Sequence, residues 1–282
     1  MGKKRILYVS QEISPYTKEN KRSNFCMNLP QVVQENDNDI RIFMPKFGTI
    51  NERRHQLHEV IRLSGMNLII DDFDHQLIIK VASVQQSRMQ VYFIDNEEYF
   101  PKRHYLNDPE GNFMQNNDER MMFFCKGVIE TVKKLGWSPD IIHCNGWFSA
   151  LVPMYIKKLY NKDPMFANTK IYYTVFDNSF KGDLNNSLSE KLLFEDLQDK
   201  DVEMIGNPTF DNLNKFAISY SDAVVQGSKK LSKNLLNFIK NNNIPVLVKT
   251  DDDNFEEQCL SFYDSTEKAK KTKKNKQLVE VV

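Results

Sequence analysis

Short apolar runs alternate with amphipathic segments from the start of the chain. Arg5–Ser10 and Asp39–Pro45 are rich in β-branched and aromatic residues, which is typical of strands buried in a parallel sheet. Asn24–Val33, between them, has helical periodicity, and we expect Pro30 to bend or end that helix. A strand, a helix and a second strand within this length predict a right-handed βαβ unit.

The pattern changes between about residues 60 and 100. Three strand-like runs follow one another without a helix, at Met66–Ile70, Gln76–Val84 and Met89–Ile94. They predict a small antiparallel insertion or an edge meander. A polar and aromatic loop follows at Asn96–Gln115.

The strongest helical pattern lies at Asp118–Leu135, and Gly136 is expected to end that helix. Beyond it, strands and helices continue to alternate. This alternation predicts an α/β fold with one Rossmann-like, doubly wound parallel sheet over residues 1–250. In chain order, the expected elements are a strand at Ile141–Cys144, a helix at Leu151–Tyr160, a strand at Lys170–Val175, a helix at Thr209–Tyr220, a strand at Ala223–Gln226, a helix from a Ser228 cap to Asn241 and a strand at Pro245–Val248.

Residues 251–282 are acidic at first and then rich in lysine over Lys268–Lys276, which predicts a disordered, solvated tail. The whole chain has 40% hydrophobic and 27% charged residues and a formal net charge of zero, which indicates a globular protein without a general nucleic-acid or membrane surface. The four cysteines show no CxxC spacing and are expected to be reduced core thiols. No apolar run is long enough to span a bilayer and no signal peptide is visible, so we expect a cytoplasmic protein.

Candidate chemistry gathers where the strand at Ile141–Cys144 turns into the next helix. His143 and Asn145 lie at the strand end, and the aromatic residues Trp147 and Phe148 follow directly. Open α/β sheets bind ligands at this edge. The sequence contains no Ser-His-Asp set, metal cluster, P-loop or GxGxxG motif, so no metal and no cofactor are expected.

Several motifs, in order, resemble the N-terminal domain of bacterial glycogen synthase and plant starch synthase. Val9–Lys18 is similar to the family's VSSEVAPFAK, Val91–Phe100 to VYFIDNPEYF and Pro139–Pro153 to PDIVHCHDWHTALVP. The resemblance runs from Arg5 to about Ile239. It implies one half of a GT-B fold, namely the acceptor-side half of a retaining glucosyltransferase that uses ADP-glucose.

The chain departs from this family at positions that the resemblance connects with the donor. The family's KTGGL loop lets bare backbone approach the donor, because glycine has no Cβ. Here the loop reads Lys18-Glu19-Asn20-Lys21-Arg22, and the Asp that follows in the family is Asn24. The last His of the family's HxHDWH segment, which the resemblance places near the transferred glucose, is Phe148, and Phe176 replaces another His.

The second, nucleotide-binding domain of a GT-B enzyme is also expected to be absent, because nothing after Val248 offers another set of βα units. In the family, that domain carries most of the contacts to the nucleotide. Charge stabilisation at the leaving diphosphate is usually the largest catalytic term. We therefore expect little or no glucan elongation by this chain alone.

Each candidate residue has a functional and a structural interpretation. Lys18 and Asn24 are candidates for donor binding, and the alternative for Lys18 is an exposed lysine on a polar loop. His143 is either a cleft residue or a hydrogen-bonded core histidine. Asn145 and Asp177 either bind sugar hydroxyls or shape turns at strand ends. The remaining candidates are the aromatic residues Trp147, Phe148 and Phe176, which form either a sugar-stacking platform or part of the core, and Asn117, Glu119 and Arg120, which are expected to cap a helix.

Three hypotheses about function stay open. The first is a shortened, degenerate glycogen or starch synthase-like protein with little or no activity alone. The second is a non-catalytic module that binds a glucan or a protein, and the third is a half-enzyme completed by a separate chain. The expected ligands are ADP-glucose or an α-glucan, and the expected partners are a second copy of the chain or a partner glycosyltransferase, associating through apolar surface at the carboxyl edge of the sheet.

Overall fold

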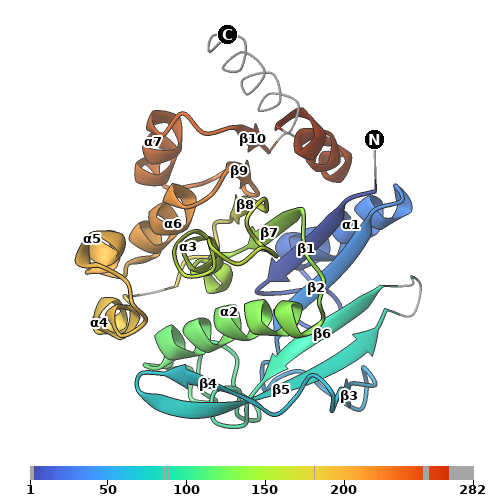
Figure 1. The fold of residues 1–282 in the computed structure, drawn as a ribbon, viewed down its shortest axis with the longest axis vertical. Coiled ribbons are helices and arrows are strands. Elements are labelled where there is room, and N and C mark those ends of the chain that lie inside the picture. Colours follow the sequence, from blue (N-terminus) through green and yellow to red (C-terminus); the bar gives the residue numbers. More distant parts are fainter. Residues whose placement is uncertain (1–2, 85–86, 88, 181, 250–253, 267–282) are drawn as a thin grey trace.

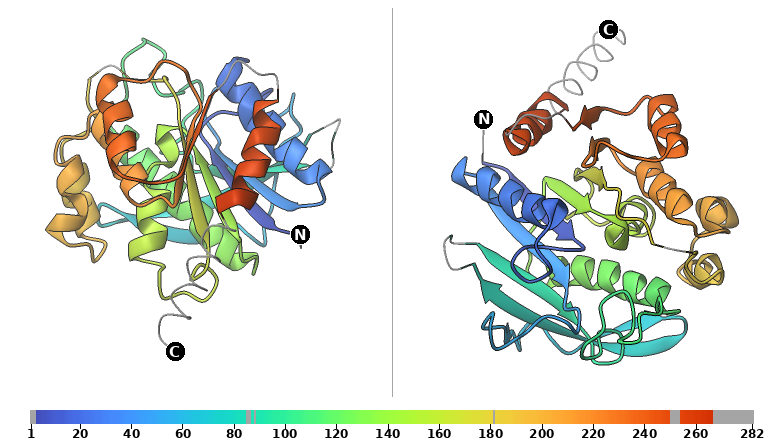
Figure 2. Two further views of the ribbon diagram at one scale, coloured as in Figure 1. Left: turned by 90° about the horizontal axis from the view of Figure 1, so that it is seen from above. Right: turned by 180° about the vertical axis from the view of Figure 1, so that it is seen from behind.

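A mostly parallel sheet of ten strands runs through the part of the chain that the computed structural model describes, which is residues 3–84, 87, 89–180, 182–249 and 254–266 (Figure 1). Helices cover both faces of this sheet (Figure 2). The strands are β1 (Arg5–Ser10), β2 (Asp39–Pro45), β3 (His58–Glu59), β4 (Met66–Ile70), β5 (Phe73–Ser83), β6 (Gln90–Asp95), β7 (Ile141–Asn145), β8 (Lys170–Val175), β9 (Ala223–Gln226) and β10 (Val246–Val248). The helices are α1 (Lys21–Glu35), α2 (Asn117–Lys134), α3 (Val152–Lys158), α4 (Leu188–Leu193), α5 (Asp199–Val202), α6 (Phe210–Ser219) and α7 (Lys233–Asn241), with 3₁₀ turns η1 (Trp147–Ser149) and η2 (Glu203–Ile205).

The strand order β10-β9-β8-β7-β1-β2-β6-β5-β3 confirms the predicted doubly wound sheet. The chain moves outward from β1 through β2 to β6, then returns to β7 and moves outward the other way. Both neighbours of β1 are parallel to it, and Ser10 lies opposite Asn145 at the carboxyl ends of β1 and β7. The strand order reverses at this point, so it is the switch point at which open α/β sheets present a ligand site.

The three predicted strands form an antiparallel meander, and the third of them also joins the parallel part of the sheet. β4 and β5 form an antiparallel pair, as expected. The third predicted strand, at Met89–Ile94, does not belong to the insertion alone: it appears as β6, which pairs parallel with β2 and antiparallel with β5. The sequence pattern cannot tell whether this strand pairs with β2 or with β5, because all but the first of its residues are buried.

Of the two expected effects of Pro30, ending the first helix is wrong. α1 continues to Glu35, with Pro30 in its interior. Leu29 and Val33 on either side of the proline are fully buried. Their packing against the core outweighs the single backbone hydrogen bond that proline removes.

Two other helix ends test the sequence predictions. Gly136 has a φ of +62° directly beyond α2, as expected for a glycine that ends a helix. The predicted cap of the helix that ends at Asn241 is wrong, because α7 begins at Lys233 and its N-cap is Ser232, whose hydroxyl accepts a hydrogen bond from the Leu235 amide at 3.1 Å. Ser228 instead donates to the Asp177 carboxylate at 3.0 Å.

The expected tail contains a further helix at residues 255–266, which we call the 255–266 helix. It lies beside α1, where the rings of Phe25 and Phe255 are 5.6 Å apart (Figure 2). Phe255, Cys259 and Tyr263 are buried. Residues 255–266 are therefore not a solvated tail, because three side chains at helical spacing complete the core. The lysine run Lys268–Lys276 lies outside the described residues.

All four cysteines are buried and free, as predicted. None of the helices within the described residues is long and apolar enough to cross a membrane.

Candidate functional site at the carboxyl ends of the central strands

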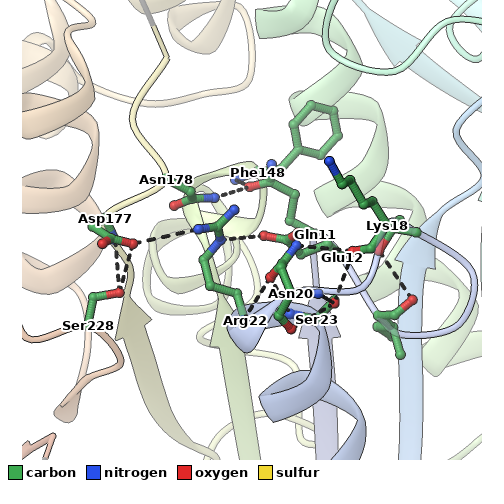
Figure 3. Close-up of polar contacts among 12 residues, drawn as sticks. Gln11, Glu12, Lys18, Asn20, Arg22, Ser23, Phe148, Asp177, Asn178 and Ser228 are labelled. Carbon is green, nitrogen blue, oxygen red and sulfur yellow. Dashed lines mark hydrogen bonds and ion pairs between the residues drawn. The ribbon is translucent and has the colours of Figure 1, made fainter.

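Three segments meet where β1, β7 and β8 end: residues 11–22, residues 145–149 and residues 176–178 (Figure 3). The Gln11 amide donates to the Asn145 carbonyl at 3.2 Å, which extends the pairing of β1 and β7 by one residue. The polar side chains at this edge bond mainly to one another.

Asn20 caps α1 through its side chain. Its carbonyl oxygen accepts hydrogen bonds from the backbone amides of Arg22 at 2.8 Å and Ser23 at 3.0 Å. The Ser23 hydroxyl accepts in turn from the backbone amide of Asn20 at 2.9 Å. The first amides of a helix are the groups that bind an anion. In α1, the Asn20 side chain occupies two of these amides.

A chain of charged contacts continues across the strand ends from Glu12, which is 7% exposed. Its carboxylate accepts from the Asn20 amide group at 2.8 Å and from Arg22 Nε at 2.7 Å. Arg22 also lies 3.6 Å from a carboxylate oxygen of Asp177, which Ser228 holds from the other side. The positive charge of Arg22 is therefore shared between two carboxylates.

Gln11 forms a second, neutral set of contacts. Its side-chain oxygen accepts from Asn178 Nδ2 at 3.3 Å and from the Phe148 amide at 3.4 Å. Gly146, with a φ of +84°, allows this approach, because a Cβ at that position would lie 3.1 Å from the Gln11 oxygen. The backbone amide of Phe148 at this turn is thus also used within the chain.

A cleft of about 550 Å³ lies above these contacts, and we call it the strand-end cleft. Its lining is mostly amide, hydroxyl and aromatic. The residues that line it are Gln11, Glu12, Tyr16, Thr17, Lys18, Asn20, Arg22, Thr49, Tyr105, Leu106, Asn178 and Ser179.

Of the residues predicted from the sequence, Lys18 alone lines this cleft. Its side chain is exposed, and its carbonyl accepts from Asn20 and Ser23. Asn24 lies on the outer surface of α1, where it donates to Glu19 at 3.2 Å. Asp177 is exposed at the end of β8 and reaches the cleft only through Arg22.

His143 is a core residue with two partners. It is fully buried, with Nδ1 bonded to the Tyr263 hydroxyl and Nε2 bonded to the Thr174 hydroxyl at 2.6 Å. Burial lowers the pKa of His143 to about 3, so the imidazole is neutral at physiological pH. Because its ring is fully buried and does not line the strand-end cleft, the interpretation as a cleft residue does not fit the structure.

Asn145 is also buried, at 1% exposure. Its amide donates to the Ser10 hydroxyl at 3.3 Å, while its side-chain oxygen has no partner within the described residues. The side chain joins the ends of β1 and β7 and does not line the strand-end cleft.

The three candidate aromatic residues belong to the core. Trp147, Phe148 and Phe176 are between 0 and 2% exposed. Trp147 packs on Phe180 with ring centroids 4.7 Å apart, and Phe148 packs on Phe47 at 5.4 Å. A sugar-stacking platform needs exposed ring faces, so this interpretation is wrong for the structure described.

The predicted capping residues of α2 have other partners. The N-cap is Asn116, which makes no side-chain cap. Asn117 donates to the Leu106 carbonyl at 2.8 Å, and Arg120, which is fully buried, donates to the Tyr99 carbonyl at 2.6 Å. Both therefore anchor the loop that brings Tyr105 to the cleft.

Four residues that line the cleft are not among the predicted site residues: Gln11, Glu12, Arg22 and Asn178. A signal existed for two of them, since Gln11 and Glu12 directly follow a buried strand. The role of Arg22 depends on the turn of residues 11–20, which brings α1 back over the strand end, and no local pattern predicts that turn. Among the described residues, no group of three His, Cys, Asp or Glu side chains could hold a metal ion.

Comparison with known proteins agrees with the motifs. Residues 5–247 match the family model described as the starch synthase catalytic domain. The chain is 38% identical over 194 residues to a glycogen synthase of Chlorobium luteolum, covering 68% of this chain and 40% of that protein. It is 34% identical over 233 residues to a glycogen synthase of Chlorobaculum tepidum, covering 82% and 47%.

A solved structure has the same fold. It is the catalytic domain of starch synthase IV from Arabidopsis thaliana bound to ADP and acarbose, with a TM-score of 0.70 and 19% sequence identity, over 90% of this chain and 53% of that one. The chain spans less than half the length of these two glycogen synthases. The match over residues 5–247 and the shared fold place this chain in the starch synthase catalytic domain family, among the glycogen and starch synthase-like glycosyltransferases.

Proposed function

We propose that this chain is a glycogen or starch synthase-like protein that has little or no ADP-glucose-dependent glucan elongation activity by itself. The observation that carries the proposal is the cap of α1, in which the Asn20 side chain accepts from the amides of Arg22 and Ser23. A donor diphosphate at this helix would have to displace that side chain. It would also meet the carboxylate of Glu12, which lines the same cleft.

The replaced histidine supports the same proposal. Phe148 is fully buried against Phe47 and Phe124 and has no polar group to offer a glucosyl residue. Transfer of a glucosyl group needs charge stabilisation at the leaving phosphate. Arg22, a half-buried cation that lines the cleft, is already shared between Glu12 and Asp177.

The test is incorporation of labelled glucose from ADP-glucose into glycogen, with a glycogen synthase of the same family as the positive control. We expect no incorporation above background. Incorporation that depends on Lys18, measured as a loss in Lys18→Ala, would overturn the proposal. The double variant Asn20→Gly and Lys21→Gly removes the competing side chain, and we expect it to bind ADP more tightly in calorimetry than the unchanged chain does.

The lining of the strand-end cleft favours a second candidate function, the binding of a neutral α-glucan. Two residues with side-chain amides that do not cap α1, Gln11 and Asn178, line it together with hydroxyl groups and two tyrosines. Amides and hydroxyls exchange hydrogen bonds with sugar hydroxyls without requiring a charged ligand. Its volume of about 550 Å³ lies within the usual range of ligand sites.

Calorimetry with maltooligosaccharides tests this second function. We expect binding that Asn178→Ala weakens and that Asn237→Ala, an exposed position on α7, leaves unchanged. Absence of heat with maltooligosaccharides, or equal weakening by both variants, would contradict it.

A further inference from the structure

Three of the six large apolar side chains that are most exposed among the described residues lie at one end of the molecule. They are Ile69 (60% exposed) and Phe73 (68%) at the β4–β5 hairpin and Phe194 (75%) directly after α4. The hairpin turn and α4 lie close together in Figure 1 and in the view from behind in Figure 2, and Lys126 contacts both Ile69 and Glu195. We call these three residues, with the acidic residues described next, the acidic-apolar patch.

The patch is built by a specific contact. Lys126 of α2 donates to the Ile69 carbonyl at 2.8 Å and to the Glu195 carboxylate at 2.7 Å. These contacts hold the hairpin and the segment after α4 together. The charges of Lys126 and Glu195 neutralise each other. The turn residues Asp71 and Asp72 have φ values of 49° and 65°, which direct the chain sharply back into Phe73.

Four more carboxylates surround these apolar side chains: Asp71, Asp72, Asp74 and Asp196. None of them forms an ion pair with another described residue. The patch therefore combines exposed apolar surface with uncompensated negative charge. A partner that fits it carries positive charge next to apolar side chains.

A segment with this chemistry follows the 255–266 helix. Six lysines lie within Lys268–Lys276, and Leu278, Val279, Glu280, Val281 and Val282 come after Gln277. This segment lies outside the described residues. The 255–266 helix that precedes it lies at the opposite end of the longest axis from the β4–β5 hairpin (Figure 1).

We propose that residues 268–282 of one copy of the chain dock on the acidic-apolar patch of a second copy. The lysines face the four aspartates, and the apolar residues that follow cover Phe73 and Phe194. This association is sensitive to salt, since raising the ionic strength from about 0.1 M to about 1 M shortens the screening length from about 10 Å to about 3 Å.

Zero-length carbodiimide crosslinking of the full chain tests the proposal, because it joins a lysine amine only to a carboxylate in contact with it. A mixture of ¹⁵N-labelled and unlabelled chains distinguishes crosslinks between copies from those within one copy. We expect crosslinks between copies that join Lys268–Lys276 to Asp71, Asp72, Asp74 or Asp196, and their loss in high salt. Crosslinks within one copy alone, or none between these segments, would overturn the proposal.

The double variant Phe73→Ser and Phe194→Ser keeps every carboxylate and removes the apolar part of the patch. We expect it to lose these crosslinks, while Ile61→Ser, at the most exposed apolar residue elsewhere, retains them. Thermal unfolding of both variants shows whether the fold is intact. If a folded double variant keeps the crosslinks, the apolar part of the proposal is wrong.

Discussion

His143 and Tyr263, which are 120 residues apart in the sequence, share a buried hydrogen bond between the imidazole Nδ1 and the phenol oxygen. The bond joins the centre of the sheet to the 255–266 helix. Thr174 holds the other ring nitrogen, so both nitrogens of a neutral histidine are satisfied away from water. His143, which the sequence suggests as a site residue, therefore has a structural role, because it connects the sheet to this helix.

Tyr263→Phe should destabilise the fold by about 1–3 kcal/mol, because it leaves a buried imidazole nitrogen without a partner. Denaturant unfolding measures the change. Tyr220→Phe is the matched control: its hydroxyl donates to the Asp201 carbonyl at 3.1 Å from a half-buried position, where water replaces it. Equal losses of stability in the two variants would show that the hydrogen bond to His143 contributes no more than the half-buried one of Tyr220.

The stability of the fold should depend on pH through His143. Its pKa is lowered by burial from 6.5 to about 3. Between these two values the unfolded chain binds a proton that the folded chain does not, so stability falls as the pH falls through this window. His143→Gln, which cannot titrate there, should reduce the slope of the unfolding free energy against pH by up to about 1.4 kcal/mol per pH unit. An unchanged slope would mean that His143 is protonated in the fold.

Asn20→Ala should cost about 1 kcal/mol of stability, because the amides of Arg22 and Ser23 lose their side-chain acceptor. Asn24→Ala, four residues further on the surface of the same helix, removes only a contact to Glu19 and should change stability by less than about 0.5 kcal/mol. Thermal unfolding of the two variants gives the comparison. A larger loss in the second variant would contradict the capping role of Asn20.

Gly227→Ala should destabilise the fold by about 1–3 kcal/mol, because the core would be overpacked. A Cβ at this position would lie 2.4 Å from a ring carbon of Phe176 and 2.6 Å from the Thr174 methyl group. Gly206→Ala is the control, since its Cβ would meet only the Glu203 carbonyl, at 3.4 Å.

Adding Phe176→Val should recover part of the stability that Gly227→Ala loses. A double-mutant cycle by denaturant unfolding measures the coupling between the two positions. Strict additivity would show that the ring and the glycine are independent. We expect coupling because the ring of Phe176, which replaces a His of the family motif, occupies the space that a side chain at residue 227 would need.

Lys191→Met should cost about 3–5 kcal/mol, because it leaves the carboxylate of Asp118 buried without its partner. Lys191 donates to Asp118 at 2.8 Å, and the Asp118 side chain is fully buried. Lys133→Met is the control, as its contact with Glu130 at 3.4 Å is half-exposed and should contribute less than about 1 kcal/mol. Asp118→Asn combined with Lys191→Met should recover much of the loss, and failure to do so would assign the effect to packing.

Much of the architecture follows from local pattern. The strand at Lys170–Val175 and the strand at Ala223–Gln226 have the predicted bounds, because each is a short apolar run between polar turns. The exception at Pro30 arises because burial on both sides of the proline is a tertiary property. The place of β6 in the main sheet is not local either, because it is decided by its pairing with β2.

The location of the candidate site was predictable from the sequence, but the side chains that form it were not. The strand ends of β1, β7 and β8 follow from the sequence, and they do meet at the switch point. Which side chains face the cleft does not follow, since the burial of His143 and Asn145 depends on what packs against their side of the sheet. The 255–266 helix, whose sequence is acidic and polar, covers one such face with three apolar residues.

The sequence by itself determined the family, the α/β alternation and the loss of the donor loop's glycines, because these are properties of residue identity and order. The tertiary structure alone decided that Asn20 closes the helix end, that Arg22 is shared by two carboxylates and that the candidate aromatic residues are core. These outcomes depend on which groups reach hydrogen-bonding or packing distance after the chain folds. Such distances join residues far apart in the sequence, and no local pattern encodes them.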